Sequence, residues 1–462
     1  MELPPDFRRQ MQSLLPDTAA FEQALEAPSP VAIRLNPAKT QPLNSLTALP
    51  WCRMGYVLPE RPSFTLDPRF HAGAYYVQDA SCMALEAVLQ QLALTPIHIL
   101  DACAAPGGKA SHLASLYPDS LVLANETIRS RATILAENTA KWGHGNLVLS
   151  QLDPSGFRAL PDFFDLMLAD VPCSGEGLFR KDQAARAEWS LANVELSARR
   201  QRRILTELWP SLKPGGILIY STCTYNRQEN EAQIEWLQTE FGAEAVDWQL
   251  PEAWPLIQAD VQGIHTLRCY PHMLPGEGFF LAAVRKPAGP SLRPRSAAKF
   301  ELLRPKDCER FSHWLKGDWY FSRQGEHIMA WPQAHLDSLR LLHGALPIQP
   351  LTLAEVKGKD LRPSQALALA LDLHRPAFAE LPLDHEQAIA YLQRQALYDL
   401  PAGPKGFTLA AFGGWPLGWL KQIDSRANNL YPQGWHIRMQ PDASTRVQAW
   451  ERLQQVIPLE SA

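Results

Sequence analysis

The 462-residue sequence predicts an α/β fold with a mostly parallel central sheet. Short apolar runs alternate with helix-length segments between residues 97 and 220, which is typical of parallel strands joined by crossover helices. The glycine-containing turn CAAPGGK, at residues 103–109, joins the first of these strands to its helix. Two later strands are each followed by a loop that contains a cysteine. Ligands of such sheets bind at the carboxyl ends of the strands, so we expect the functional site there.

Composition restricts the class of protein. With 46% hydrophobic and 20% charged residues the chain is typical of globular proteins, and its length predicts two to four domains. No apolar run is long enough to span a bilayer and the N-terminus does not resemble a signal peptide, so we expect a cytoplasmic protein without a membrane partner. No two of the seven cysteines have CxxC spacing, so the sequence indicates neither a metal site nor a disulfide framework. The net charge of −4 means that a nucleic acid would need a local basic face.

The elements follow in order along the chain. We expect a small N-terminal α+β domain at residues 1–72, with a helix at 7–15 and a strand at 31–35. The sheet domain is expected at 73–287. Its predicted strands lie at 97–100, 121–124, 147–149, 164–169, 216–220 and 278–284, with helices ending near 94 and spanning 107–116 and 129–142.

The C-terminal third begins with a linker, because residues 287–294 read PAGPSLRP. An intermediate α+β module is expected at 288–382 and a smaller mixed or β-rich module at 383–462. Their predicted strands lie at 314–321, 327–331, 407–412 and 416–420, with a short helix at 364–371.

The glycine turn and two acidic residues indicate a Rossmann-like cofactor site. Gly107 and Gly108 let a ligand approach the backbone, and the helix N-terminus offers free N–H groups. Glu126 ends the second strand, where such folds hold a ribose hydroxyl, and Asp153 follows the third, placed to accept from an adenine amino group. The turn lacks both the dinucleotide and the nucleoside-triphosphate signatures. S-adenosylmethionine is the best remaining candidate.

The two cysteine loops indicate nucleophilic chemistry on a pyrimidine. Cys173 and Cys223 follow separate strands, and Asp170 directly precedes the first loop. Carbon 5 of cytosine becomes nucleophilic when a thiolate adds to carbon 6 and ring nitrogen 3 is protonated, and Asp170 is a natural partner for that nitrogen. These residues alone do not rank the two cysteines. We interpret the cysteines at 52, 103, 269 and 308 as small core residues.

The chain resembles the Sun-type family of RNA cytosine-5 methyltransferases, in its bacterial small-subunit rRNA branch, RsmF. The motifs that carry the resemblance are YYVQD at 75–79, CAAPGGK at 103–109, ANE at 124–126 with Arg131, DVPCSGEGLFRK at 170–181, KPGG at 213–216, YSTCTYN at 220–226 with ENE at 229–231, PH at 271–272 and GEGFF at 276–280. Asp79 and Cys82 depart from the family's usual glutamate and serine. In the C-terminal module, GGWPLGW at 413–419 and NLYPQG at 429–434 resemble a PUA-like RNA-binding module.

This resemblance implies a class I S-adenosylmethionine methyltransferase core with a seven-stranded, mostly parallel sheet. It also implies that Cys223 attacks the base, that Cys173 assists release and that Asp170 contacts ring nitrogen 3. The implied cofactor contacts are Cys103, Ala104, Ala105, Pro106, Gly107, Gly108, Lys109, Glu126, Arg131, Asp153 and Asp170.

RNA is the expected partner of a monomeric enzyme, with rRNA or the small ribosomal subunit favoured. A tRNA substrate remains an alternative, and so does a non-catalytic RNA-binding or ribosome-assembly protein. The candidate RNA contacts are Arg180, Lys181, Arg199, Arg200, Arg202, Arg203, His265, Arg268 and His272, with Tyr75 and Tyr76 either stacking on bases or packing in the core.

Overall fold

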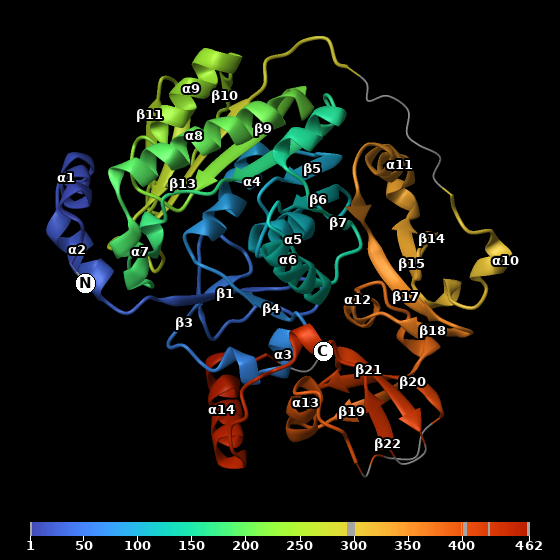
Figure 1. Cartoon of the computed structure of the whole chain (residues 1–462). Coiled ribbons are helices and arrows are strands. Elements are labelled where there is room, and N and C mark those ends of the chain that lie inside the picture. Colours follow the sequence, from blue (N-terminus) through green and yellow to red (C-terminus); the bar gives the residue numbers. More distant parts are fainter. Residues whose placement is uncertain (1, 293–300, 399, 401–403, 424–425, 460–462) are drawn as a thin grey trace.

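A ten-stranded sheet forms the centre of the molecule in the computed structural model, which describes residues 2–292, 301–398, 400, 404–423 and 426–459 (Figure 1). Its strand order is β11-β12-β13-β9-β8-β5-β6-β7-β16, and β10 pairs with β13. The strands are β5 (His98–Asp101), β6 (Leu121–Asn125), β7 (Leu147–Ser150), β8 (Phe164–Asp170), β9 (Leu212–Thr222), β10 (Glu244–Ala245), β11 (Ile257–Val261), β12 (Ile264–Cys269), β13 (Phe279–Arg285) and β16 (Ile348–Gln349).

The five central strands, from β9 to β7, are parallel to one another, which confirms the predicted fold class. The sheet is larger than the seven strands predicted, because β10 and the edge strands β11 and β16 extend it through antiparallel pairing. Nearly all residues of the central strands are buried, as expected for a parallel sheet covered on both faces.

Helices cover both faces of this sheet. One hydrophobic core includes residues of α8, α9 and α11, and a second, on other strand residues, includes residues of α4 and α5. The helices of this region are α4 (Leu85–Leu92), α5 (Gly108–Leu116), α6 (Arg129–Trp142), α7 (Gln183–Glu188), α8 (Leu191–Leu208) and α9 (Glu231–Phe241).

The N-terminal domain contains a four-stranded sheet in the order β2-β3-β1-β4. Its elements are α1 (Pro5–Leu14), α2 (Thr18–Glu26), β1 (Val31–Leu35), β2 (Thr47–Ala48), β3 (Gly55–Leu58), α3 (Pro68–His71) and β4 (Tyr75–Val77). Helices α1 and α2 lie away from this sheet and pack beside α7 instead (Figure 1). The N-terminal segment therefore contacts the region of the central sheet at two places, through α1 and α2 and through its own sheet.

Two modules complete the chain. The intermediate module contains α10 (Pro305–Cys308), β14 (Trp319–Gln324), β15 (His327–Pro332), α11 (Leu336–Ala345), β17 (Leu351–Lys357), β18 (Asp360–Pro363) and α12 (Gln365–Leu369). The last module contains β19 (Ala379–Leu383), α13 (His385–Leu392), β20 (Gly406–Phe412), β21 (Trp415–Ile423), β22 (Arg426–Asn429) and α14 (Ala443–Val456). The strand expected at 314–321 begins only at Trp319, because Trp314 lies in a 3₁₀ turn.

The modules are joined by shared packing. Residues of the N-terminal sheet and of the C-terminal module form one hydrophobic core, which buries Ile33, Leu381 and Ile457. The ammonium of Lys39 donates to the carbonyl oxygens of Ala72, Lys141 and Leu369, which belong to three different modules. Strand β4 of the N-terminal sheet lies after the predicted domain limit at residue 72, and β19 crosses the predicted limit at residue 382. The division into domains itself stays a prediction. Within the described residues, no helix is long and apolar enough to cross a membrane.

Candidate active site

The two predicted cysteines meet at the carboxyl end of the sheet. Strands β8 and β9 are parallel neighbours, with Asp170 paired to Ser221, so their loops leave the same edge. The Sγ atoms of Cys173 and Cys223 are 3.1 Å apart, and both side chains are half-buried. The hydrogen bond with Cys223 and burial together raise the pKa of Cys173 well above its ordinary value. Cys173 therefore keeps its proton at neutral pH.

Asp170 connects these thiols to the glycine turn. Its Oδ1 accepts from Ser221 Oγ at 2.7 Å, and its Oδ2 accepts from Lys109 Nζ at 2.8 Å. Burial is the largest single cause and lowers the pKa of Lys109, but Asp170, Cys82 and Asp101 together outweigh it, and the net pKa is raised. Lys109 is therefore a permanent cation that holds Asp170 between the cysteine loops and α5.

A cavity beside the glycine turn brings together most of the predicted cofactor residues. Those that line it are Cys103, Ala104, Ala105, Pro106, Gly108, Lys109 and Asp170. The opposite wall comes from the N-terminal segment, with Tyr76, Gln78, Asp79 and Cys82. Gly107 adopts a φ of +114°, a left-handed conformation that favours glycine, and begins the turn into α5.

Asp101, at the end of β5, also lines this cavity and was not singled out from the sequence. Its side chain is fully buried, and neither carboxylate oxygen has a hydrogen-bond partner among the described residues. Burial, followed by the nearby Asp170 carboxylate, raises the pKa of Asp101 to about 8. An unpartnered buried carboxyl group fits a cationic ligand, and S-adenosylmethionine carries both an ammonium and a sulfonium. The cavity thus fits the predicted cofactor.

The remaining predicted cofactor residues lie around the cavity. Glu126 is buried at the end of β6 and accepts from the Ile128 N–H at 2.9 Å. Arg131 lies 3.4 Å from the Glu126 carboxylate and donates to the Ala105 carbonyl at 2.9 Å, so it braces the glycine turn. Asp153 lies on the surface, where it forms an ion pair with Arg203 at 2.7 Å. Their contacts with a cofactor stay predictions.

Several candidate RNA contacts are structural instead. Arg180 is buried and donates to the Ala24 carbonyl at 2.7 Å, and buried Arg268 pairs with Glu231. Tyr75 is buried and donates to Asp67 at 2.9 Å, so it packs rather than stacks. The expectation for Arg180 and Arg268 was wrong, because both side chains are used to join elements, and Tyr75 takes the packing alternative.

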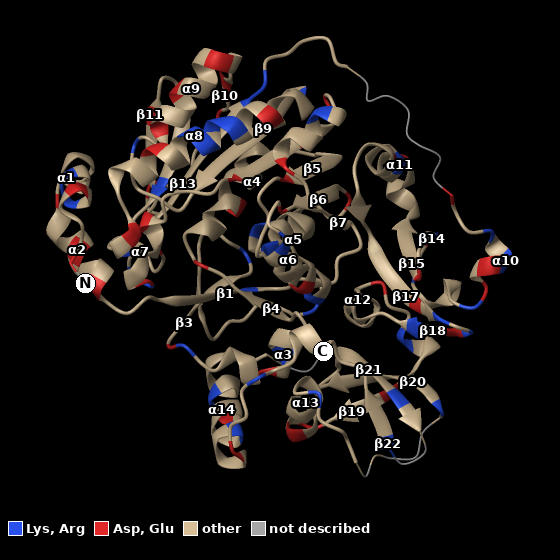
Figure 2. Ribbon diagram, viewed as in Figure 1, with Lys and Arg blue, Asp and Glu red and all other residues tan. Residues whose placement is uncertain are grey.

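The other basic residues keep more exposure. Lys181 lies within 3.6 Å of Asp79 and within 3.5 Å of Glu277. On α8, where the basic residues stand together (Figure 2), Arg199 pairs with Glu195 one turn earlier on the helix. Arg200 and Arg202 also lie on α8, and His265 and His272 on the segment before β13. Their roles toward RNA stay predictions.

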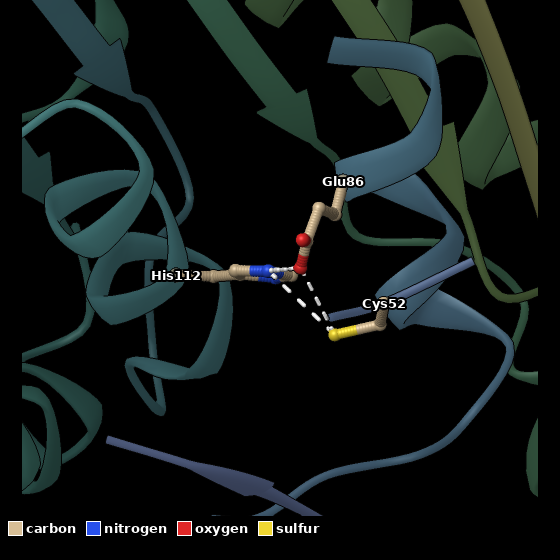
Figure 3. A group of neighbouring side chains, drawn as sticks. All are labelled: Cys52, Glu86 and His112. Carbon is tan, nitrogen blue, oxygen red and sulfur yellow. Dashed lines mark hydrogen bonds and ion pairs between the residues drawn. The ribbon is translucent and has the colours of Figure 1, made fainter. Parts of the chain in front are cut away.

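One buried group outside this site consists of metal-ligating residue types. Cys52, Glu86 and His112 have ligand atoms within 4.8 Å of one another (Figure 3). The Glu86 carboxylate accepts from the Cys52 thiol at 3.0 Å and from His112 Nε2 at 2.8 Å. It also accepts from the Arg53 N–H at 3.1 Å and from the Gln90 amide at 3.0 Å. Four donors occupy this carboxylate, so the group joins the N-terminal domain to α4 and α5 through hydrogen bonds.

Three known protein families match parts of this chain. Residues 91–285 match the family described as 16S rRNA methyltransferase RsmB/F. Residues 3–80 match the N-terminal domain of 16S rRNA methyltransferase RsmF, and residues 378–437 match the methyltransferase RsmF PUA domain.

Individual relatives are similar in sequence to this chain over nearly its whole length. The ribosomal RNA small subunit methyltransferase F of Citrobacter koseri is 32% identical over 93% of this chain and 96% of its own. The same-named protein of Salmonella paratyphi B is 31% identical with equal coverage. Among solved structures, NSun6 from Pyrococcus horikoshii with SFG has a TM-score of 0.50 at 21% identity, covering 61% of this chain and 98% of that one. This structural likeness supports the fold.

Proposed function

Because the chain belongs to the RsmB/F family of S-adenosylmethionine-dependent RNA methyltransferases, we propose that it methylates carbon 5 of cytidine in small-subunit rRNA. Membership of the family supports methylation of RNA. The choice of carbon 5 and the roles of the individual residues are our proposal.

The cofactor would be held by the turn at residues 103–109 and by two acidic groups. Asp101 would pair with its ammonium, and Glu126 would accept from the ribose hydroxyls. When bound, S-adenosylmethionine supplies an electrophilic methyl group. Asp170 and Lys109 line the same cavity, and Asp170 directly precedes the loop of Cys173.

The covalent chemistry would use the thiol pair in two stages. The Cys223 thiolate forms a bond to carbon 6, the electrons of the double bond between carbons 5 and 6 move into the ring, and ring nitrogen 3 takes up a proton from solvent that Asp170 delivers. Carbon 5 is then nucleophilic and becomes methylated. Loss of the carbon 5 proton restores the double bond and breaks the sulfur–carbon bond, and Cys173 assists this release.

The single observation that carries this proposal is the 3.1 Å contact between Cys173 and Cys223 beside Asp170. The raised pKa of Cys173 supports the division of roles, because a thiol that holds its proton is the poorer nucleophile. A pair of core cysteines would not need an adjacent carboxylate that is held by a lysine.

The test compares two variants that should fail in different ways. Cys223→Ala should lose methylation and keep cofactor binding. Cys173→Ala should accumulate a covalent RNA–protein adduct that survives denaturing gels. Cys308→Ala is a matched control, because Cys308 is buried in α10 of the intermediate module and its loss should leave turnover intact.

Labelled S-adenosylmethionine with small subunits, naked rRNA or tRNA from a strain lacking the gene would identify the substrate. Label in small-subunit 5-methylcytosine supports the proposal, and label only in tRNA would move the substrate to the alternative. Full turnover by Cys223→Ala would refute the mechanism. Binding of RNA without any methylation would favour the non-catalytic alternative.

A further inference from the structure

Two buried carboxylates connect the loops that carry the two thiols. Glu176 lies three residues after Cys173, and Glu229 lies six residues after Cys223. Both side chains are fully buried. Each carboxylate binds backbone N–H groups of the opposite loop, so the two connections cross.

Glu176 holds the loop of Cys223. Its Oε2 accepts from the N–H groups of Tyr225 at 2.7 Å and Asn226 at 2.9 Å, and from the Thr224 hydroxyl at 2.5 Å. Its Oε1 accepts, at 3.1 Å each, from side chains of distant segments, which are Gln10 of α1, Trp189 and Asn226. One carboxylate thus fixes the three residues that follow Cys223 and ties them to the N-terminal helix.

Glu229 holds the loop of Cys173 in return. Its Oε2 accepts from the Ser174 N–H at 3.0 Å and from the Gln201 amide at 2.8 Å, and its Oε1 accepts from the Asn226 amide at 2.7 Å. The Gly177 N–H also donates to the carbonyl of Cys223 at 2.7 Å. The two loops therefore move as one body.

We infer that Glu176 and Glu229 are positioning residues that set the distance between the Cys173 and Cys223 thiols. Neither lines the cofactor cavity, so they act through the cysteines. The functional consequence rests on the proposed function, in which both sulfurs must reach one pyrimidine. Displacement of a reacting group by about 1 Å lowers rates by as much as ~100-fold.

The test replaces Glu176 with glutamine. The amide keeps the size of the carboxylate, but its NH₂ must face donors on one side or the other, so at least one hydrogen bond to the Cys223 loop is lost in either orientation. Oxidation by diamide reports the thiol distance directly. Two thiols lose two protons and two electrons, one S–S bond forms and diamide is reduced to the hydrazine, and peptide mass mapping identifies the Cys173–Cys223 link.

We expect Glu176→Gln to slow formation of this link and to lower kcat, each by roughly 10–100-fold, while KM for RNA changes less than about threefold. Glu86→Gln is the matched control, because Glu86 is also a buried carboxylate filled by donors, yet it contacts neither cysteine loop. It should lose comparable thermal stability and keep both the oxidation rate and kcat.

If Glu176→Gln forms the Cys173–Cys223 link at the wild-type rate and keeps the wild-type kcat, the inference is overturned. An equal slowing in Glu86→Gln would also overturn it, because the effect would then be general destabilisation. If Glu176→Gln does not fold, Thr224→Val removes one donor from the same carboxylate, and wild-type oxidation in that variant refutes the inference. The oxidation assay uses neither RNA nor cofactor, so its result is separate from the Cys223→Ala test of the proposed function.

Discussion

Replacing Asp101 with asparagine should stabilise the fold and weaken cofactor binding. Neither oxygen of this buried carboxyl accepts a side-chain hydrogen bond from the described residues, and burial is the main cause that raises its pKa from 3.8 to about 8. Between these values the unfolded chain is ionised while the folded protein keeps the proton. Wild-type stability should therefore fall as pH rises through this window and change no further above about pH 8 from this group.

The magnitude follows from the shift. Each pKa unit corresponds to about 1.4 kcal/mol, so the free energy of unfolding of Asp101→Asn relative to wild type should grow by up to ~4 kcal/mol between about pH 5 and pH 8. Urea unfolding of both proteins at several pH values measures this difference, and other titrating groups cancel in the comparison.

Cofactor binding gives the second readout. Pairing with an ammonium favours the ionised carboxyl, so wild type should release a proton when S-adenosylmethionine binds near neutral pH. Calorimetry in buffers of different ionisation enthalpy detects this proton, and Asp101→Asn should release none and bind roughly 10–100-fold more weakly. If the unfolding free energies of wild type and Asp101→Asn change in parallel with pH, and both proteins bind S-adenosylmethionine equally well, the reasoning is refuted.

Other substitutions test separate parts of the site. Asp170→Asn should lower kcat by at least ~100-fold, and retained turnover would exclude its role at ring nitrogen 3. Gly177→Ala would place Cβ 2.2 Å from the Cys223 carbonyl oxygen, so it should displace that loop and lower methylation about tenfold or more; a wild-type rate would show that the loop tolerates the shift. Asp153→Ala should raise the cofactor Kd about tenfold and Arg203→Ala should not; calorimetry giving equal effects would assign Asp153 a structural role.

The parts of the site predicted best from the sequence are the loops that directly follow predicted strands. The loops of Cys173 and Cys223 follow apolar strands, and parallel neighbours bring such loops together, so their meeting follows from local patterns. The glycine turn and Asp170 were placed by the same argument.

Local sequence patterns could not predict which polar side chains are buried, or which residues far apart in the sequence pair with each other. Arg180 and Arg268 read as surface cations, yet they bind Ala24 and Glu231, which lie 156 and 37 residues away in the sequence. Asp101 was missed because its importance comes from having no partner, which is a property of the folded core. Glu176 belongs to a recognised motif, but only the structure shows which six donors it accepts.

Strand β16 gives the intermediate module a part in protecting the chain from aggregation. It covers the outer edge of β7, and Leu339 and Leu342 of α11 enter the core shared with α8. A fragment that ended at the linker would leave β7 with unpaired N–H and C=O groups beside exposed apolar surface, which is a template for association between copies. The methyltransferase region therefore shares one sheet edge and part of its core with the segment after the linker, which covers that edge.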